Sequence, residues 1–235
     1  MAPHTPQRSD RPGGAVAALD PTRRFYPVFL DLTGRSCLVV GGGPVAEAKV
    51  DGLLAAGAQV SLVSPVLTER LAAWAREGRI RHVAREYAAA DLEGHDLVFS
   101  ATGDRAVTEA VARDGRARRT WVNAADDPVF CDFLLPAVVR RGRLVIAVST
   151  SGASPGLARA IREDLEGQFT EDYAPLVELV SEVRRELRGQ DDRPAPTAWR
   201  RGLDQDLRAL LAEGRRAEAK TLLTARLRTP ETARE

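Results

Sequence analysis

The stretch that decides the fold is SCLVVGGGPVAEAK, residues 36–49, in which a short apolar run enters three glycines and a helical pattern leaves them. The β-branched residues Val39 and Val40 favour an extended strand. Gly41 can adopt a tight turn at no steric cost because it has no Cβ atom. The stretch therefore predicts a strand, a tight turn and the beginning of a helix.

A glycine turn in this setting is typical of proteins that bind a dinucleotide. Gly43 lets the backbone approach a pyrophosphate closely, and Ala46 is small enough for the helix to pack against the strand. The free N–H groups of the first helical turn would face the phosphates. We therefore expect a nicotinamide or adenine dinucleotide here. The alternative is a glycine-rich turn in another kind of α/β protein.

One part of the dinucleotide fingerprint is missing at the end of the second predicted strand, residues 59–63. An Asp or Glu usually stands there and binds the ribose hydroxyls, whereas this chain has Ser64 and Pro65. Ser64 offers one hydroxyl but not the charge-assisted hydrogen bond of a carboxylate. Because no Arg directly follows Ser64 to bind a 2′-phosphate, we predict NAD rather than NADP.

Strands and helices alternate through the first half of the chain. Further strands are predicted at residues 80–84, 97–100 and 120–122, and helices at residues 45–57, 67–77 and 106–117. Alternation with short connections favours a parallel sheet covered on both faces. A ligand of such a sheet lies outside the carboxyl ends of the strands. Polar clusters follow two of these ends, at residues 101–104 and 123–128, although ordinary turn chemistry would also account for them.

The pattern changes in the second half. Residues 133–139 and 144–149 are predicted to form two antiparallel strands joined by a short loop that contains Gly142. Ser154 and Pro155 predict an N-cap and the first position of a helix that reaches residue 165. The apolar hairpin would need to be covered, for example by a second subunit. Beyond it we predict a helix from residue 171, a linker at residues 190–196, and helices at residues 198–211 and 215–227.

The composition narrows the class of protein. The chain has 34 basic and 33 acidic residues, so its net charge does not favour nucleic acid or a membrane surface. Its apolar runs are far shorter than the ~20 residues of a membrane helix, and its start lacks the apolar core of a secretory signal. Cys37 and Cys131 form no disulfide framework, and Cys37 is expected to pack in the core. The histidines, His4, His82 and His95, have no metal-ligand spacing and are expected on the surface or in loops, so we predict no metal site. The composition as a whole predicts a cytoplasmic protein.

Four segments, in this order, resemble the precorrin-2 dehydrogenase / sirohydrochlorin ferrochelatase family of siroheme synthases. They are YPVFLDL at residues 26–32, GGGPVAEAK at 41–49, NAAD at 123–126 and IAVSTSGASP at 146–155. The resemblance covers residues 24–227. We do not expect the methyltransferase domain that is fused to some members.

The resemblance implies NAD-dependent oxidation of precorrin-2 to sirohydrochlorin and, in some members, insertion of ferrous iron to give siroheme. It also implies a homodimer that binds the tetrapyrrole between its domains. Together with strand-end position, it predicts ten cofactor-binding residues: Gly41, Gly42, Gly43, Pro44, Val45, Ser64, Pro65, Val66, Thr102 and Asp104.

The aspartate of the family's N-x-x-D motif is the residue most closely tied to the chemistry, and here it is Asp126. A carboxylate in the crevice can accept a proton while the nicotinamide takes a hydride. Asp127 is the neighbouring alternative, although a turn residue is also expected directly before Pro128. Asp104 is a third candidate.

The substrate carries eight carboxylates, which favour Arg side chains and backbone N–H donors as partners. We expect Arg159 to bind it, because Arg159 lies one turn into the helix that follows the hairpin. A solvated charged face is the alternative. The predicted substrate-binding residues are Asn123, Ser151, Gly152, Ser154 and Arg159.

The chain is therefore expected to be an α/β protein with a Rossmann-like parallel-sheet domain, a small α+β dimerisation block and a C-terminal helical domain. The predicted boundaries are a disordered extension at 1–23, an NAD-binding domain at 24–122, the dimerisation block with the catalytic loop at 123–168, the helical domain at 169–228 and a frayed tail at 229–235. Two other functions stay open: a regulatory Rossmann module that senses NAD without catalysis, and a chelating member that has lost oxidation.

Overall fold

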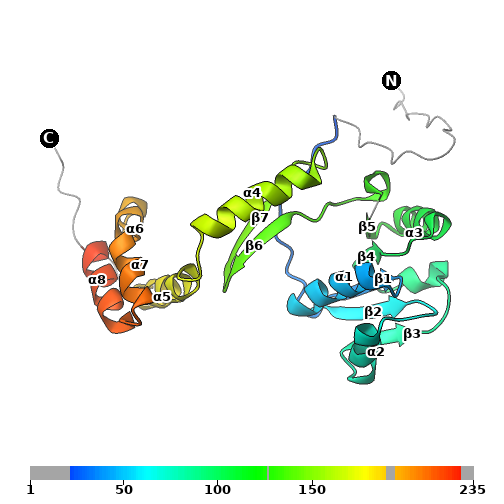
Figure 1. Cartoon of the computed structure of the whole chain (residues 1–235), viewed down its shortest axis with the longest axis horizontal. Coiled ribbons are helices and arrows are strands. Elements are labelled where there is room, and N and C mark those ends of the chain that lie inside the picture. Colours follow the sequence, from blue (N-terminus) through cyan, green and yellow to red (C-terminus); the bar gives the residue numbers. More distant parts are fainter. Residues whose placement is uncertain (1–21, 126, 189–193, 229–235) are drawn as a thin grey trace. The chain divides into compact units, whose positions relative to one another are not determined.

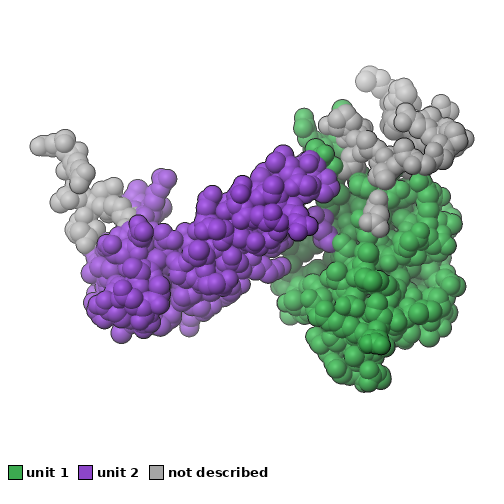
Figure 2. Space-filling model, viewed as in Figure 1, with its two compact units in different colours: residues 1–134, 151–153 green, residues 135–150, 154–235 purple. Residues whose placement is uncertain are grey.

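The structure is a computed structural model that describes residues 22–125, 127–188 and 194–228. It divides into two compact units, Met1–Leu134 with Ser151–Ala153, and Leu135–Thr150 with Ser154–Glu235 (Figure 2). Most of the predicted N-terminal extension, the predicted frayed tail and Asp126 lie outside the described residues. The predicted domain boundaries stay predictions.

The first unit is built on a five-stranded parallel sheet with the order β3-β2-β1-β4-β5 (Figure 1). Its strands are β1 (Ser36–Val40), β2 (Gln59–Val63), β3 (Ile80–Val83), β4 (Leu97–Ser100) and β5 (Trp121–Ala124). The order reverses between β1 and β4, which lie side by side although β2 and β3 separate them in sequence. The predicted Rossmann-like parallel sheet is confirmed.

Helices cover both faces of this sheet. They are α1 (Pro44–Ala55), α2 (Glu69–Arg76) and α3 (Arg105–Arg118), with short 3-10 helices η1 (Ala89–Leu92) and η2 (Pro128–Phe130). Cys37 and Val39 contribute to one core with α1 and α2, whereas Leu38 and Val40 contribute to a second core with α3. Successive side chains of a strand point to opposite faces of the sheet. A strand that is covered by helices on both faces therefore contributes alternate residues to two cores. The prediction that Cys37 is a core residue is confirmed.

The helix ends follow local signals in the sequence. α1 ends before Gly57, which has a φ of +76° and donates its N–H to the Leu54 carbonyl, as predicted. Thr68 is the N-cap of α2, and its hydroxyl accepts the N–H of Leu71. The end of β5 differs from the prediction. Asn123 pairs in register with Phe99 of β4, so it lies inside β5 and not in the loop after it.

The second unit begins with a two-stranded antiparallel sheet, β6 (Ala137–Arg141) and β7 (Leu144–Val148), covered by α4 (Pro155–Gln168). The predicted antiparallel hairpin is confirmed, but β6 starts later than expected. Pro136 lacks the N–H group that a ladder position needs, so the strand begins only after it. Ser154 caps α4 as predicted, with its hydroxyl accepting the N–H of Leu157.

Four more helices of the second unit share one apolar core. They are α5 (Tyr173–Glu186), α6 (Pro196–Gly202), α7 (Gln205–Ala212) and α8 (Arg216–Arg228). The single helix predicted at residues 198–211 is wrong, because the chain breaks between α6 and α7. The Asp204 carboxylate accepts the Leu207 N–H at 3.1 Å and starts a new helix there. The predicted linker lies mostly outside the described residues.

Within the described part of the chain, no helix combines the length and the apolar character that crossing a membrane requires.

Candidate dinucleotide-binding site

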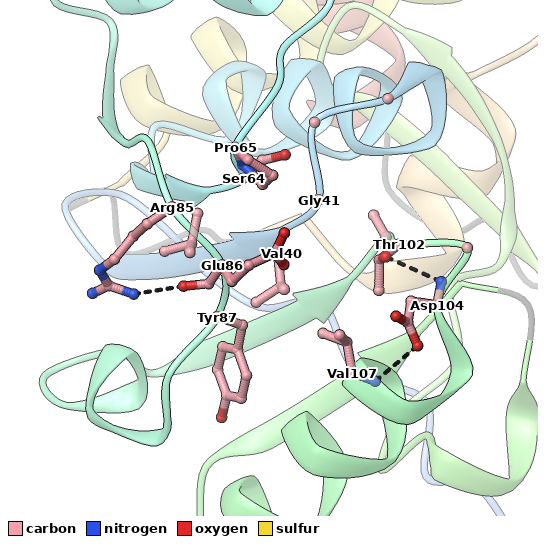
Figure 3. Close-up of a pocket in the computed structure, with 15 residues that line it drawn as sticks. Val40, Gly41, Ser64, Pro65, Arg85, Glu86, Tyr87, Thr102, Asp104 and Val107 are labelled. Atoms are coloured by element: carbon pink, nitrogen blue, oxygen red, sulfur yellow. Dashed lines mark hydrogen bonds between the residues drawn. The ribbon is translucent and has the colours of Figure 1, made fainter.

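A pocket of about 330 Å³ lies at the carboxyl edge of the parallel sheet (Figure 3). Four segments line it: the glycine turn after β1, Ser64 and Pro65 after β2, residues 85–87 after β3, and residues 101–104 before α3. The pocket thus spans the point between β1 and β4 where the strand order reverses. Open α/β sheets bind their ligands at this point.

The first two glycines are required by the fold itself. Gly41 has a φ of +119°, and a Cβ atom there would overlap the Ala101 carbonyl. A Cβ atom at Gly42 would overlap the Val66 carbonyl and come within 2.7 Å of Ser64 Oγ. The turn can therefore pass between β2 and β4 only without side chains.

Gly43 is different, because a Cβ atom there would meet no described atom within 4 Å. It is the N-cap residue of α1, its φ is −88°, and no described side chain caps the start of this helix. The space beside Gly43 and the uncapped N–H groups of α1 together fit a pyrophosphate, which needs close backbone approach and N–H donors. A dinucleotide bound here would supply the hydride-accepting nicotinamide.

Ser64 lies at the pocket, but its hydroxyl is already used. Ser64 Oγ donates to the Val66 carbonyl at 2.7 Å, and the Ser64 carbonyl lies 2.9 Å from His82 Nε2. His82 is half-buried within β3, an edge strand of the sheet. Pro65 lines the pocket beside Ser64.

Thr102 and Asp104 line the pocket on the β4 side. Thr102 Oγ1 accepts the backbone N–H of Asp104 at 3.1 Å. Asp104 Oδ1 accepts the N–H groups of Ala106 and Val107 at 2.8 and 3.3 Å, so this carboxylate caps α3. Pro44, Val45 and Val66, also predicted to bind the cofactor, are not among the residues that line the pocket.

Arg85, Glu86 and Tyr87 are the lining residues that sequence reasoning missed (Figure 3). Arg85 is bound to Asp91 through two N–O contacts of 2.8 and 2.5 Å, and this pair lowers the pKa of the Asp91 carboxyl. Tyr87 donates its hydroxyl to Asp114 at 3.1 Å. The sequence could have indicated these residues, because they follow a predicted parallel strand and the carboxyl ends of all parallel strands reach the same edge of the sheet.

The predicted catalytic Asp126 is not among the described residues, but its neighbours are. Asp127 Oδ1 accepts the N–H of Val129 at 3.3 Å and caps η2, which is the turn role expected as its alternative. Asn123 is 5% exposed, and its Nδ2 donates to the Phe133 carbonyl at 3.0 Å. The described structure gives the Asn123 amide a structural contact, and its predicted role in substrate binding stays a prediction.

The remaining predicted substrate residues have local structural settings. Ser151 and Gly152 form a turn with φ values of +55° and +83°. Ser154 caps α4, and its backbone N–H and carbonyl both bond to Thr150 Oγ1 at 3.0 Å. Arg159 pairs with Glu163 at 2.9 Å, in an exposed position where such pairs are weak.

Both cysteines are buried. Burial raises the pKa of the Cys37 thiol to about 11 and also raises that of Cys131. The Cys131 thiol bonds to the backbone of Ala124. Among the described residues, no group of three His, Cys, Asp or Glu side chains is placed to hold a metal ion.

Comparisons with known proteins agree with this geometry. A family model described as "Putative NAD(P)-binding" matches residues 28–137, and one described as "Sirohaem biosynthesis protein central" matches residues 141–168. The fold, the glycine turn and the first match define the chain as an NAD(P)-binding protein of the Rossmann class.

Among curated relatives, the siroheme synthase of Methylobacillus flagellatus is 43% identical over 69% of this chain and 35% of its own length. That of Nitrosococcus oceani is 36% identical over 87% of this chain and 44% of its own. The chain thus spans less than half the length of these relatives. The solved structure of SirC, a precorrin-2 dehydrogenase, aligns with a TM-score of 0.71 and 29% identity, over 86% of this chain and 100% of SirC. These matches confirm the resemblance to the family of siroheme synthases and precorrin-2 dehydrogenases that the sequence motifs indicated.

Proposed function

We propose that the protein oxidises precorrin-2 to sirohydrochlorin with NAD in the biosynthesis of siroheme. The observation that carries the proposal is the glycine turn, where Gly43 leaves an open space in front of the uncapped start of α1. The similarity to SirC along its full length supports the choice of substrate. The oxidation removes one hydride and one proton from the macrocycle.

Each part of the pocket has a role in this reaction. Gly41 and Gly42 hold the turn in place, and the N–H groups at the start of α1 bind the pyrophosphate. Asp126, two residues beyond the last residue of β5, is our candidate for the group that accepts the proton. Its support is its position after a parallel strand that pairs with β4, together with the family motif.

We further propose a cytoplasmic homodimer formed through the hairpin and α4. Leu157 and Ile161 lie one turn apart on α4 and are 53% and 37% exposed. Apolar side chains exposed side by side favour an interface. Arg159 on the same helix, with Ser151, Gly152 and Ser154, is proposed to bind the carboxylates of the tetrapyrrole.

Ferrous iron is proposed only as a substrate that could be inserted into sirohydrochlorin after its oxidation. In the proposed oxidation NAD takes the hydride, and the chain's own residues bind and orient the substrate and accept the proton. Asp126 is again the candidate group, because a carboxylate can accept the pyrrole protons that the metal displaces.

The test gives the purified protein precorrin-2 and NAD and follows absorbance for NADH and for sirohydrochlorin. Ferrous or cobaltous ion is added only afterwards, so that oxidation and metal insertion are recorded separately. The proposal expects NADH and sirohydrochlorin in equal amounts. NAD binding without any oxidation would favour a regulatory module, and metal insertion without oxidation would favour a pure chelatase. Light scattering on the same sample tests the dimer.

A further inference from the structure

We propose that Glu86 supplies the ribose-binding carboxylate that is missing from the end of β2, and that it thereby selects NAD over NADP. This inference rests on the proposed dinucleotide site. In the usual fingerprint, an acidic residue at the end of the second strand accepts a hydrogen bond from the ribose 2′-hydroxyl. Here that position holds Ser64 and Pro65, and the Ser64 hydroxyl is bonded to Val66.

Strand pairing brings Glu86 to the same place from the neighbouring strand. β2 and β3 are parallel and in register, with Val63 opposite Val83, so their carboxyl ends lie together. The Val83 carbonyl accepts the N–H groups of both Ser64 and Arg85, at 3.2 and 3.0 Å. Glu86 follows directly and lines the same pocket as Ser64.

The Glu86 carboxylate is directed into the pocket. In Figure 3 it extends toward Val40 and Gly41, whereas the Arg85 side chain extends the opposite way. Among the described residues, no group forms a hydrogen bond with the Glu86 carboxylate. Asp104, the other acidic residue of the lining, already caps α3. Glu86 is therefore the carboxylate of this lining whose acceptor atoms are open to a ligand.

The neighbours of Glu86 hold its backbone in position. Arg85 binds Asp91 through two contacts and donates to the Glu86 carbonyl at 2.8 Å. Tyr87 is bonded to Asp114, which is 8% exposed. These contacts also occupy the Arg85 guanidinium, the cation of this lining that could otherwise attract a 2′-phosphate. An open carboxylate would accept the 2′-hydroxyl of NAD and repel the 2′-phosphate of NADP.

The test measures dissociation constants of the full chain for three probes: NAD, NADP and NAD with a 2′-deoxyadenosine. For the unchanged protein we expect NAD to bind more tightly than both other probes. Glu86→Gln should weaken NAD about tenfold, bring NADP closer to NAD, and remove the difference between NAD and the 2′-deoxy probe. Glu86→Asp should retain part of the preference. Glu93→Gln, at an exposed glutamate outside the pocket, is the matched control.

Two results would overturn the inference without affecting the proposed function. One is that Glu86→Gln leaves all three constants unchanged, and the other is that it tightens NAD, as expected if Glu86 opposes the pyrophosphate. Failure of the unchanged protein to bind either dinucleotide would instead refute the proposed function. Thermal unfolding of each variant checks that the fold is intact, as expected for substitutions at the exposed residues Glu86 and Glu93.

Discussion

The carbonyl oxygen of Val66 occupies the space that a side chain at Gly42 would need. The loop after β2 is held against the glycine turn, because the Thr68 N–H donates to the Gly42 carbonyl at 2.9 Å. Gly43, the next residue, has no described atom in the corresponding space. Two adjacent glycines therefore differ: Gly42 is needed for packing, whereas Gly43 is the one that we propose to bind the ligand.

This separation predicts opposite outcomes for two alanine variants. Gly42→Ala should lower the free energy of unfolding by about 1–3 kcal/mol, because the new methyl group overlaps backbone that must shift. Gly43→Ala should keep the stability, since its φ of −88° suits any residue, but should weaken NAD binding about tenfold or more. Urea unfolding and NAD titration of both variants check this. Tight NAD binding by both Gly43→Ala and Gly43→Asp would show that the pyrophosphate lies elsewhere.

Asp126 and Asp127 can be told apart in the same way. Asp126→Ala should abolish NADH formation from precorrin-2 and leave NAD binding nearly intact, because the proposed role of this carboxylate is to accept the proton. Asp127→Asn is the matched control, since Asp127 caps η2. It should retain most of the rate. If Asp126→Ala turned over normally and Asp127→Asn did not, the two assignments would have to be exchanged.

The buried Cys37 thiol predicts a loss of stability in alkali. Its pKa is raised from 9.0 to about 11 by burial, so the folded chain keeps its proton at pH values where the unfolded chain loses it. Below pH 8 the thiol is neutral in both states and has no effect. Between pH 9 and 11 the free energy of unfolding should fall by about 2 kcal/mol from this group, and by up to about 2.7 kcal/mol once the pH is well above both pKa values.

Urea unfolding at pH 8 and pH 10.5 measures this effect against Cys37→Ala. The variant should lose less stability over the same range, whereas any effect of Cys131 and Tyr87, whose pKa values are also raised by burial, is common to both proteins. Equal losses in both proteins would contradict the prediction.

The break between α6 and α7 predicts a specific weak point in the helical core. Asp204 caps α7 and also contacts Arg226 of α8 at 2.6 Å. Asp204→Ala should therefore reduce the free energy of unfolding by about 1–2 kcal/mol. Asp206→Ala is the control. The Asp206 carboxylate is 78% exposed, and its contact with Arg226 is long, at 3.4 Å. This substitution should therefore lower the free energy of unfolding by less than about 0.5 kcal/mol. Thermal unfolding of the two variants checks the difference, which would vanish if Asp204 did not cap the helix.

Several parts of the fold could be predicted because their signals are local. Glycine conformation and side-chain periodicity indicated β1, the turn and α1, and Ser154 with Pro155 indicated the start of α4. Periodicity alone gave a wrong prediction at residues 198–211. The apolar spacing continues there through the break between α6 and α7, which depends on the capping side chain of Asp204. Periodicity also placed Asn123 in a loop, because the length of β5 depends on its pairing with β4.

The amino-acid sequence by itself determined the strand–turn–helix at residues 36–55 and the family that the chain resembles, since both depend on residues that are close neighbours or occur in a fixed order. Only the tertiary structure decided which residues share the pocket. Glu86 and Ser64 line the same pocket because β2 pairs with β3. The Ala101 carbonyl lies against Gly41 because β4 pairs with β1. Pairing between strands that are far apart in the chain depends on how whole helices and strands pack, and no local pattern encodes it.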